Sequence, residues 1–194
     1  TAEGALPYWR NQPDLPVLVI PGEEVSTDKG HVLALFVKRS IRPGLFTKVI
    51  EEIHEQDGLA FLAHPYHISL KKFWKPPQTK VTELDLQQLD GIELINGHSR
   101  SRANQAAKKL AQNYKEPLAL LSCSDAHFPW EIGGCSTSVI TKEFTLDGIY
   151  NSLSRRQVTP NPPTIINRLF NQWCYYWVAL DNKISGKTYA YEGK

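Results

Sequence analysis

The stretch Leu118-Ala-Leu-Leu-Ser-Cys-Ser-Asp-Ala-His127 decides how the rest of the sequence is interpreted, because an apolar run there ends in a carboxylate and an imidazole. Successive side chains of a β-strand point to opposite faces, so we expect Asp125 and His127 to project to the same side at the carboxyl end of a strand. One of these side chains can then hold a metal ion while the other holds a neighbouring ion.

Three other apolar runs also stop at a residue that can bind metal, and they are Val17–Glu24, Leu59–His64 and Ile92–Asn96. Functional residues at the carboxyl ends of strands are typical of α/β barrels and open α/β sheets. We therefore expect these strands to be neighbours in one largely parallel, curved sheet that carries a metal cluster at one edge.

Helical patterns separate the apolar runs. Phe46, Val49, Ile50 and Ile53 have the spacing of an amphipathic helix that ends at Gly58, and residues 101–114 form the clearest helix of the sequence. Further helices are expected at 83–89 and 146–153, and further strands at 31–37 and 137–140. The turn residues Thr27–Gly30 can join two strands as a hairpin, which would bring His31 back beside Glu24. This alternation predicts an α/β protein.

Composition narrows the class of protein. The 22 Lys and Arg residues nearly balance the 20 Asp and Glu residues in the 194-residue chain, so the net charge does not indicate nucleic-acid binding. Binding through a local basic patch stays an open alternative. The three cysteines show no CxxC spacing, so we expect neither a disulfide framework nor a cysteine zinc site. The longest apolar run, 173–180, is too short to cross a bilayer. We therefore expect a cytoplasmic protein with no membrane partner.

Four ordered motifs carry a resemblance to a known family. They are Pro21-Gly-Glu-Glu-Val-Ser-Thr27 followed by Gly30-His31, then Ala63-His64-Pro65, then Gly91-Ile-Glu-Leu-Ile-Asn96, then Ser124-Asp-Ala-His127 with Ile132-Gly-Gly134. This order resembles the PHP (polymerase and histidinol phosphatase) family. The resemblance implies a PHP-like barrel domain over 1–157, and we expect residues 158–194 to form a helical extension packed on it.

The resemblance also implies a fold and a ligand set. The fold would be a distorted (β/α)7 barrel that holds up to three divalent ions, Zn, Mn or Fe, at the strand carboxyl ends. Glu24 would bridge two ions, His31 and His64 would complete one site, Asp125 would bind the adjacent ion, and His127 would serve a third. Glu23 is left out, because strand alternation turns it to the opposite face. The family opens with an HxH strand and further ligands, so we expect this sequence to begin after them, without the first strand or strands.

The function implied by the resemblance is hydrolysis of a phosphomonoester or phosphodiester by a metal-activated water, with Glu24 and Asp125 as catalytic residues. The substrate would be a phosphorylated small molecule or a nucleotide. Two alternatives stay open: a non-catalytic PHP-like binding or regulatory module, and a metal-dependent C–N hydrolase on a related barrel.

Other residues have weaker signals. His67, His98 and Arg100 lie in predicted loops near strand ends and are candidates for substrate binding, although a solvated loop is the alternative for each. Lys71, Lys72 and Arg102 could likewise meet phosphate oxygens. The apolar stripe between Ile165 and Leu180 has helical spacing, which favours packing against the barrel, with a partner-binding or membrane-facing surface as the alternative. An oligomer could form through this segment or through an exposed sheet edge.

Overall fold

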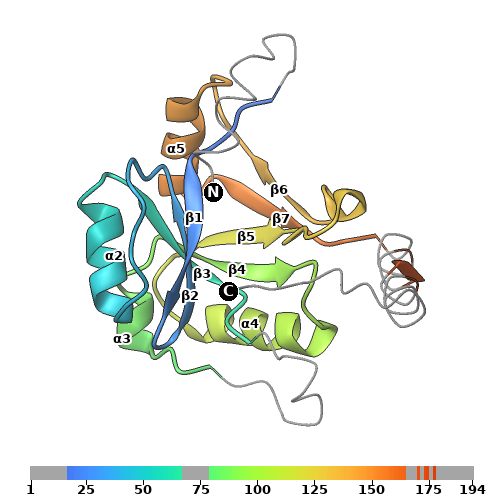
Figure 1. The fold of residues 1–194 in the computed structure, drawn as a ribbon, viewed down its shortest axis with the longest axis horizontal. Helices are drawn as coiled ribbons and strands as arrows, with labels where there is room; N and C mark the ends of the chain where they lie inside the picture. Colours follow the sequence, from blue (N-terminus) through green and yellow to red (C-terminus); the bar gives the residue numbers. More distant parts are fainter. Residues whose placement is uncertain (1–16, 67–78, 165–169, 171–172, 175–176, 178–194) are drawn as a thin grey trace, which may run out of the picture.

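The computed structural model describes residues 17–66, 79–164, 170, 173, 174 and 177, and it arranges them as an α/β domain (Figure 1). The elements in chain order are β1 (Gly22–Thr27), β2 (Gly30–Leu35), α2 (Phe46–His54), β3 (Leu59–Ala63), α3 (Glu83–Leu86), β4 (Gly91–Asn96), α4 (Ser101–Asn113), β5 (Ala119–Cys123), the 3-10 helix η2 (Pro129–Glu131), β6 (Ser136–Val139), α5 (Leu146–Ser154) and β7 (Val158–Asn161).

Within the described ranges, β1 to β5 form one sheet in chain order, and β6 and β7 form a separate antiparallel pair. Strands β3, β4 and β5 pair in parallel, whereas β2 is antiparallel to both β1 and β3. The sheet is therefore mixed: β1 runs in the same direction as β3, β4 and β5, but β2 lies antiparallel between β1 and β3, so β1 is not the neighbour of β3 that we expected. A short turn joins β1 to β2, and a connection that short can only join antiparallel strands. The described strands do not close into a barrel.

The first strand differs from its prediction. We expected a strand at Val17–Ile20 that delivers Glu24 at its end, but residues 17–20 have no regular structure and β1 begins at Gly22. Val17 is 50% exposed, so this apolar run is not a buried strand. Pairing with β2 places Glu24 opposite Leu33, in the middle of the hairpin. The hairpin register, rather than the apolar run, therefore decides where Glu24 lies.

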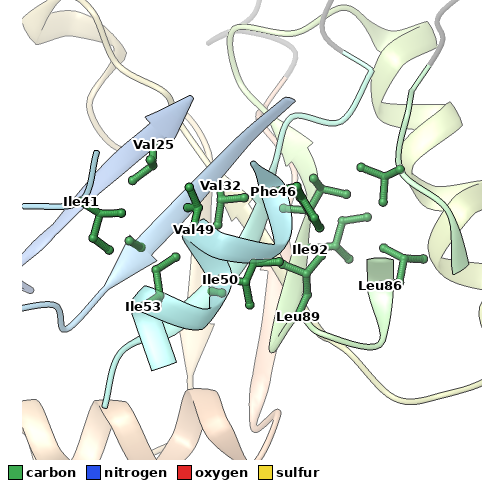
Figure 2. Close-up of a cluster of buried hydrophobic side chains, with 14 of the residues drawn as sticks. Val25, Val32, Ile41, Phe46, Val49, Ile50, Ile53, Leu86, Leu89 and Ile92 are labelled. Atoms are coloured by element: carbon green, nitrogen blue, oxygen red, sulfur yellow. The ribbon is translucent and has the colours of Figure 1, made fainter. Parts of the chain in front are cut away.

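The hydrophobic core covers both faces of β3. Ala60 and Leu62 pack in the cluster that α2 covers, and Figure 2 shows Phe46, Val49 and Ile50 from that helix beside Val32 of β2. Leu59 and Phe61 point into a second cluster with Ala119, Leu121 and Leu153. All five residues of β3 are buried. This strand is thus a rigid support for the residue that follows it, His64.

Helix α2 is tied to the β1–β2 turn as well as to the core. The backbone N–H of Phe46, the first residue of α2, donates to Oδ1 of Asp28 in that turn at 2.7 Å. A carboxylate at a helix N-terminus satisfies an otherwise unpaired N–H and interacts favourably with the helix dipole. This contact fixes the hairpin against the helix.

Strand β5 lies at one edge of the main sheet and contacts the second sheet. Its Ser122 N–H donates to Oγ1 of Thr137 in β6 at 2.8 Å, and its hydroxyl donates to the carbonyl of Asn161 in β7 at 2.7 Å. The β6–β7 pair therefore covers the edge at β5.

The segment beyond residue 157 starts with a strand. Val158–Asn161 form β7, so the first residues of the expected helical extension are not helical, because they pair with β6. Phe170, Trp173, Cys174 and Trp177 are helical, and the three aromatic side chains are exposed while Cys174 is buried. No helix in the described ranges is long and apolar enough to cross a membrane. The division of the chain at residue 157 stays a prediction.

Candidate metal centre

The β1–β2 hairpin places Glu24 and His31 on one face of the sheet. Ser26 pairs with His31 and Glu24 pairs with Leu33, so Glu24 and His31 are diagonal neighbours. Val25, between Glu24 and Ser26, points to the opposite face and is buried in the core. Oε1 of Glu24 forms a hydrogen bond with Nδ1 of His31. The expected hairpin and the proximity of these two side chains are therefore present.

His64 reaches the same carboxylate from β3. Its Nε2 lies 2.9 Å from Oε1 of Glu24, and the His31 and His64 rings meet edge to face with centroids 5.1 Å apart. Alternation along β3 would carry His64 to the face of Leu62, but the chain leaves the strand after Ala63 and His64 has a φ of 23°. Left-handed backbone is unfavourable for a residue with a Cβ and needs support from its surroundings.

Glu93 supplies part of that support, and our sequence interpretation missed it as a site residue. It is 5% exposed on β4, and its Oε2 accepts the His64 backbone N–H at 2.7 Å. The side-chain amide of Asn96 donates to the same oxygen at 3.2 Å and to Oδ2 of Asp125 at 3.0 Å. A single carboxylate inside the apolar run Gly91-Ile-Glu-Leu-Ile-Asn96 was the signal that could have identified Glu93.

The hydrogen bonds and charges around Glu24, His64 and Glu93 change the pKa of each of these groups. The hydrogen bond with His31 and then that with His64 hold the pKa of Glu24 well below its usual range. Burial by itself lowers the pKa of His64, but the hydrogen bond to Glu24 and the negative charges of Glu24, Glu93 and Asp125 outweigh burial and raise it. Burial raises the pKa of Glu93. Glu24 is thus an ionised carboxylate held between two imidazoles.

Asp125 and His127 lie close together, but not for the reason that we expected. Strand β5 ends at Cys123, and Asp125 has a φ of 50° in the loop that follows, so strand alternation does not reach these residues. Oδ1 of Asp125 and Nε2 of His127 are nevertheless 3.8 Å apart. A turn of the loop, rather than the strand period, brings the two side chains together.

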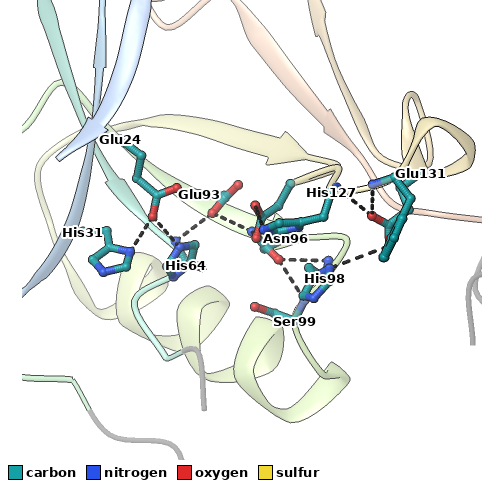
Figure 3. Close-up of polar contacts among 11 residues, drawn as sticks. Glu24, His31, His64, Glu93, Asn96, His98, Ser99, His127 and Glu131 are labelled. Atoms are coloured by element: carbon teal, nitrogen blue, oxygen red, sulfur yellow. Dashed lines mark hydrogen bonds and ion pairs between the residues drawn. The ribbon is translucent and has the colours of Figure 1, made fainter. Parts of the chain in front are cut away.

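A second group of potential ligands contains His127, His98 and Glu131. Nδ1 of His98 lies 3.7 Å from Oε1 of Glu131, and the rings of His98 and His127 have centroids 4.5 Å apart. Burial, and then the charge of His127, lower the pKa of His98. Figure 3 shows this group at one end of a row of polar side chains, with Glu24, His31 and His64 at the other end. Glu131 was not among the residues that we selected from the sequence.

The remaining predicted residues have these positions. Glu23 lies on the opposite face from Glu24, where its carboxylate accepts from the Ile41 N–H at 2.5 Å and from the Ser40 hydroxyl at 3.0 Å. Arg100 immediately precedes α4. His67, Lys71 and Lys72 lie outside the described residues.

The Glu24, His31 and His64 side chains fit a divalent ion. Each offers one ligand atom, and the three atoms lie within 4.8 Å of one another. Two imidazole nitrogens and a carboxylate oxygen are a donor set that Zn, Mn and Fe accept. Both imidazole nitrogens already lie within hydrogen-bond distance of one oxygen of Glu24, so the three ligand atoms are close enough together to bind one ion. Metal binding by each residue stays a prediction.

These observations define a class: an α/β domain with histidines and carboxylates gathered near the carboxyl ends of its parallel strands.

The model of the PHP-associated family matches residues 101–158. Two uncharacterized proteins of Methanocaldococcus jannaschii are similar to this chain. MJ0417 is 30% identical over 116 residues, which are 59% of this chain and 48% of that protein. MJ1587 is 31% identical over 119 residues, which are 58% of this chain and 66% of that protein. The chain thus matches less than two thirds of either relative's length.

Solved structures have the same fold. A two-domain protein of Bacteroides vulgatus that contains a predicted PHP-like metal-dependent phosphoesterase superposes with a TM-score of 0.61 at 23% identity, over 82% of this chain and 49% of that one. PsfC from Pseudomonas syringae superposes with a TM-score of 0.57 at 20% identity, over 82% of this chain and 66% of that one. The family match at residues 101–158 and the fold shared with these two structures support a PHP-family domain in this chain.

Proposed function

We propose that this protein is a metal-dependent phosphoesterase that hydrolyses a phosphomonoester or phosphodiester. The observation that carries the proposal is the convergence of His31 Nδ1 and His64 Nε2 on one oxygen of Glu24. The fold shared with the Bacteroides vulgatus protein, which contains a predicted PHP-like metal-dependent phosphoesterase, supports it. We also propose that the described sheet is part of a distorted (β/α)7 barrel, and that the protein acts in the cytoplasm.

Glu24, His31 and His64 would hold one divalent ion, Asp125 would bind an adjacent ion, and His127 would serve a third. A divalent ion at such a site lowers the pKa of a bound water and neutralises phosphoryl oxygens. The protein's own part is to fix the ligands: Glu93 holds the His64 backbone, and Asn96 holds the Asp125 carboxylate. Ligands held in this way lose less conformational entropy when an ion binds.

The substrate would be a phosphorylated small molecule or a nucleotide. Arg100 is proposed to contact it, because a guanidinium is suited to phosphate oxygens and Arg100 follows the carboxyl end of β4 closely. His67 has the same proposed role on the basis of the sequence alone.

The test is a hydrolysis assay with an aryl phosphate monoester, an aryl phosphate diester and an aryl amide, each with and without added Mn²⁺ or Zn²⁺. The chain should be assayed together with any residues that its gene encodes before Thr1. We expect metal-dependent release of phenol from at least one phosphate ester and none of the amine from the amide. Cleavage of the amide alone would favour the C–N hydrolase, and metal binding without any turnover would favour a binding module.

A matched pair of variants tests the residue assignment. Glu24→Gln should abolish most metal-dependent hydrolysis, because it removes the charge that faces both imidazoles. Glu51→Gln makes the same chemical change on α2, where Glu51 pairs with Lys48 at 2.6 Å and is 55% exposed. Glu51→Gln should keep the activity of the unaltered protein. Equal activity in the two variants would remove Glu24 from the reaction.

A further inference from the structure

We propose that Trp130, stacked on Phe128, binds the nucleobase of a nucleotide substrate. The inference rests on the proposed function and selects the nucleotide among the substrates considered there. The planes of the two aromatic rings are 4° from parallel, and the ring centroids lie 4.6 Å apart. Trp130 is 39% exposed, and Ile132, two positions further on, is 75% exposed. Large apolar side chains that gather at one exposed place mark a binding surface, whereas single ones do not.

The aromatic stack lies directly beside the candidate metal centre. Phe128 follows His127 in the chain, and Trp130 precedes Glu131. Figure 3 shows His127 and Glu131 at one end of the row of polar side chains. Three residues of extended chain span at most about 11 Å, so the backbone of Trp130 stays within that distance of the backbone of His127. A substrate whose phosphate lies in that row therefore has the aromatic stack within reach of its other end.

The loop that carries the stack is fixed by a buried carboxylate. Glu131 is 3% exposed, and its Oε2 accepts the backbone N–H groups of His127 at 2.7 Å and Phe128 at 3.0 Å. Pro129, between the two aromatic residues, is the first residue of η2, and its ring restricts the backbone there. The rings are thus held in place before a ligand arrives, and such a surface loses less conformational entropy when it binds.

The chemistry of the stack determines the class of ligand. The face of an aromatic ring pairs well with another flat ring, in an offset stack, and a sugar or an alkyl chain has no such face to offer. Every nucleobase has such a face, so an aromatic stack selects nucleotides as a class rather than one particular base. A phosphorylated sugar without a base would lose this contact. Trp130 is therefore a residue that determines specificity, and the groups around Glu24 remain the reacting part of the site.

Adenosine tests the inference without requiring hydrolysis, because it has the base but no phosphate. In an NMR titration of the full chain, adenosine should shift the indole N–H resonance of Trp130, and ribose should not. The resonance of Trp173 should stay in place. Trp173 is the matched control, because it is 60% exposed and is also stacked on an aromatic ring, that of Trp177.

Variants of the two tryptophans measure the size of the effect. Trp130→Ala should weaken adenosine binding by roughly fivefold or more, which is the usual loss when a base-stacking side chain is removed. Trp130→Phe keeps a flat ring and should retain most of the binding. Trp173→Ala should leave the binding unchanged.

Hydrolysis connects the stack with the proposed reaction. Adenosine 5′-monophosphate and ribose 5-phosphate carry the same phosphate ester and differ in the base. With added Mn²⁺, kcat/KM should be higher for the nucleotide by roughly fivefold or more, and Trp130→Ala should remove this preference by lowering kcat/KM for the nucleotide alone.

The outcomes separate this inference from the proposed function. Equal hydrolysis of both esters by the unaltered protein would overturn the inference and leave the phosphoesterase intact. Hydrolysis of neither ester, with the Trp130 resonance still shifted by adenosine, would contradict the phosphoesterase and support the base-binding surface. If Trp130→Ala lowers the free energy of unfolding but leaves adenosine binding unchanged, the stack is a structural contact and the inference is overturned.

Discussion

Nε2 of His64 lies 2.9 Å from Oε1 of Glu24, although the two residues are 40 positions apart in the sequence. The contact crosses β2, because Glu24 is on β1 and His64 follows β3. It exists because the hairpin register brings Glu24 to the site face and because His64 leaves the strand with a positive φ.

This relationship predicts that His64 contributes to zinc binding. At a zinc concentration of about 100 times the dissociation constant, one bound ion should stabilise the protein by about 2.7 kcal/mol. His64→Ala should weaken zinc binding at this site at least about tenfold, which is about 1.4 kcal/mol, and so should reduce the zinc-induced rise in Tm.

His54→Ala is the matched control for that experiment, because His54 also pairs with a carboxylate, Asp90 at 3.0 Å, but lies on α2. Its zinc-induced rise in Tm should equal that of the unaltered protein. An equal reduction of the zinc-induced rise in Tm in both variants would show that zinc does not bind specifically to His64.

Glu93 is predicted to stabilise the fold at the base of the site. Glu93→Ala would leave the His64 N–H and the Asn96 amide without the oxygen that they share. An unsatisfied buried donor costs about 1–3 kcal/mol, so the free energy of unfolding should fall by at least that amount in urea denaturation. A loss smaller than about 0.5 kcal/mol would mean that the buried carboxylate does not hold the His64 backbone.

His54 predicts a pH dependence of stability. The hydrogen bond to Asp90 raises the pKa of His54 in the folded protein, so its contribution to stability is full below the unfolded pKa of about 6.5 and is lost as the pH rises through the folded pKa. We compare the free energy of unfolding of the unaltered protein with that of His54→Gln.

The difference between the two proteins should be larger at about pH 5.5 than at about pH 9, because both retain the other histidines and only one can ionise at position 54. The side chain of His54 is 42% exposed, so solvent reduces the effect. A difference that grows with pH would contradict the raised pKa.

The core under the site gives a fourth prediction. Phe46 is 1% exposed on α2, and Phe46→Ala should lower the free energy of unfolding by about 3–5 kcal/mol, because it leaves a cavity beneath β2 and β3. The adjacent Leu45 is 61% exposed, and Leu45→Ala should change the free energy of unfolding by no more than about 0.5 kcal/mol. Urea denaturation of both variants measures the contrast, and similar losses would show that α2 does not pack as described.

The sequence by itself determined the elements whose patterns are local. The apolar spacing of Phe46, Val49, Ile50 and Ile53 gave α2, and the alanine-rich pattern of 101–114 gave α4 almost to its ends. The apolar run before His64 gave β3. These assignments succeeded because one face of a helix, or a strand buried on both faces, leaves a periodic record in the sequence.

The tertiary structure alone decided how those elements place the polar groups. Val17–Ile20 is apolar enough for a strand, but pairing with β2 selected Gly22–Thr27 instead. Glu93 and Glu131 are buried, and burial depends on what packs around a residue rather than on its neighbours in sequence. The positive φ values of His64 and Asp125 also arise at strand ends, where the hydrogen bonds of the folded protein, rather than the strand period, set the direction of a side chain.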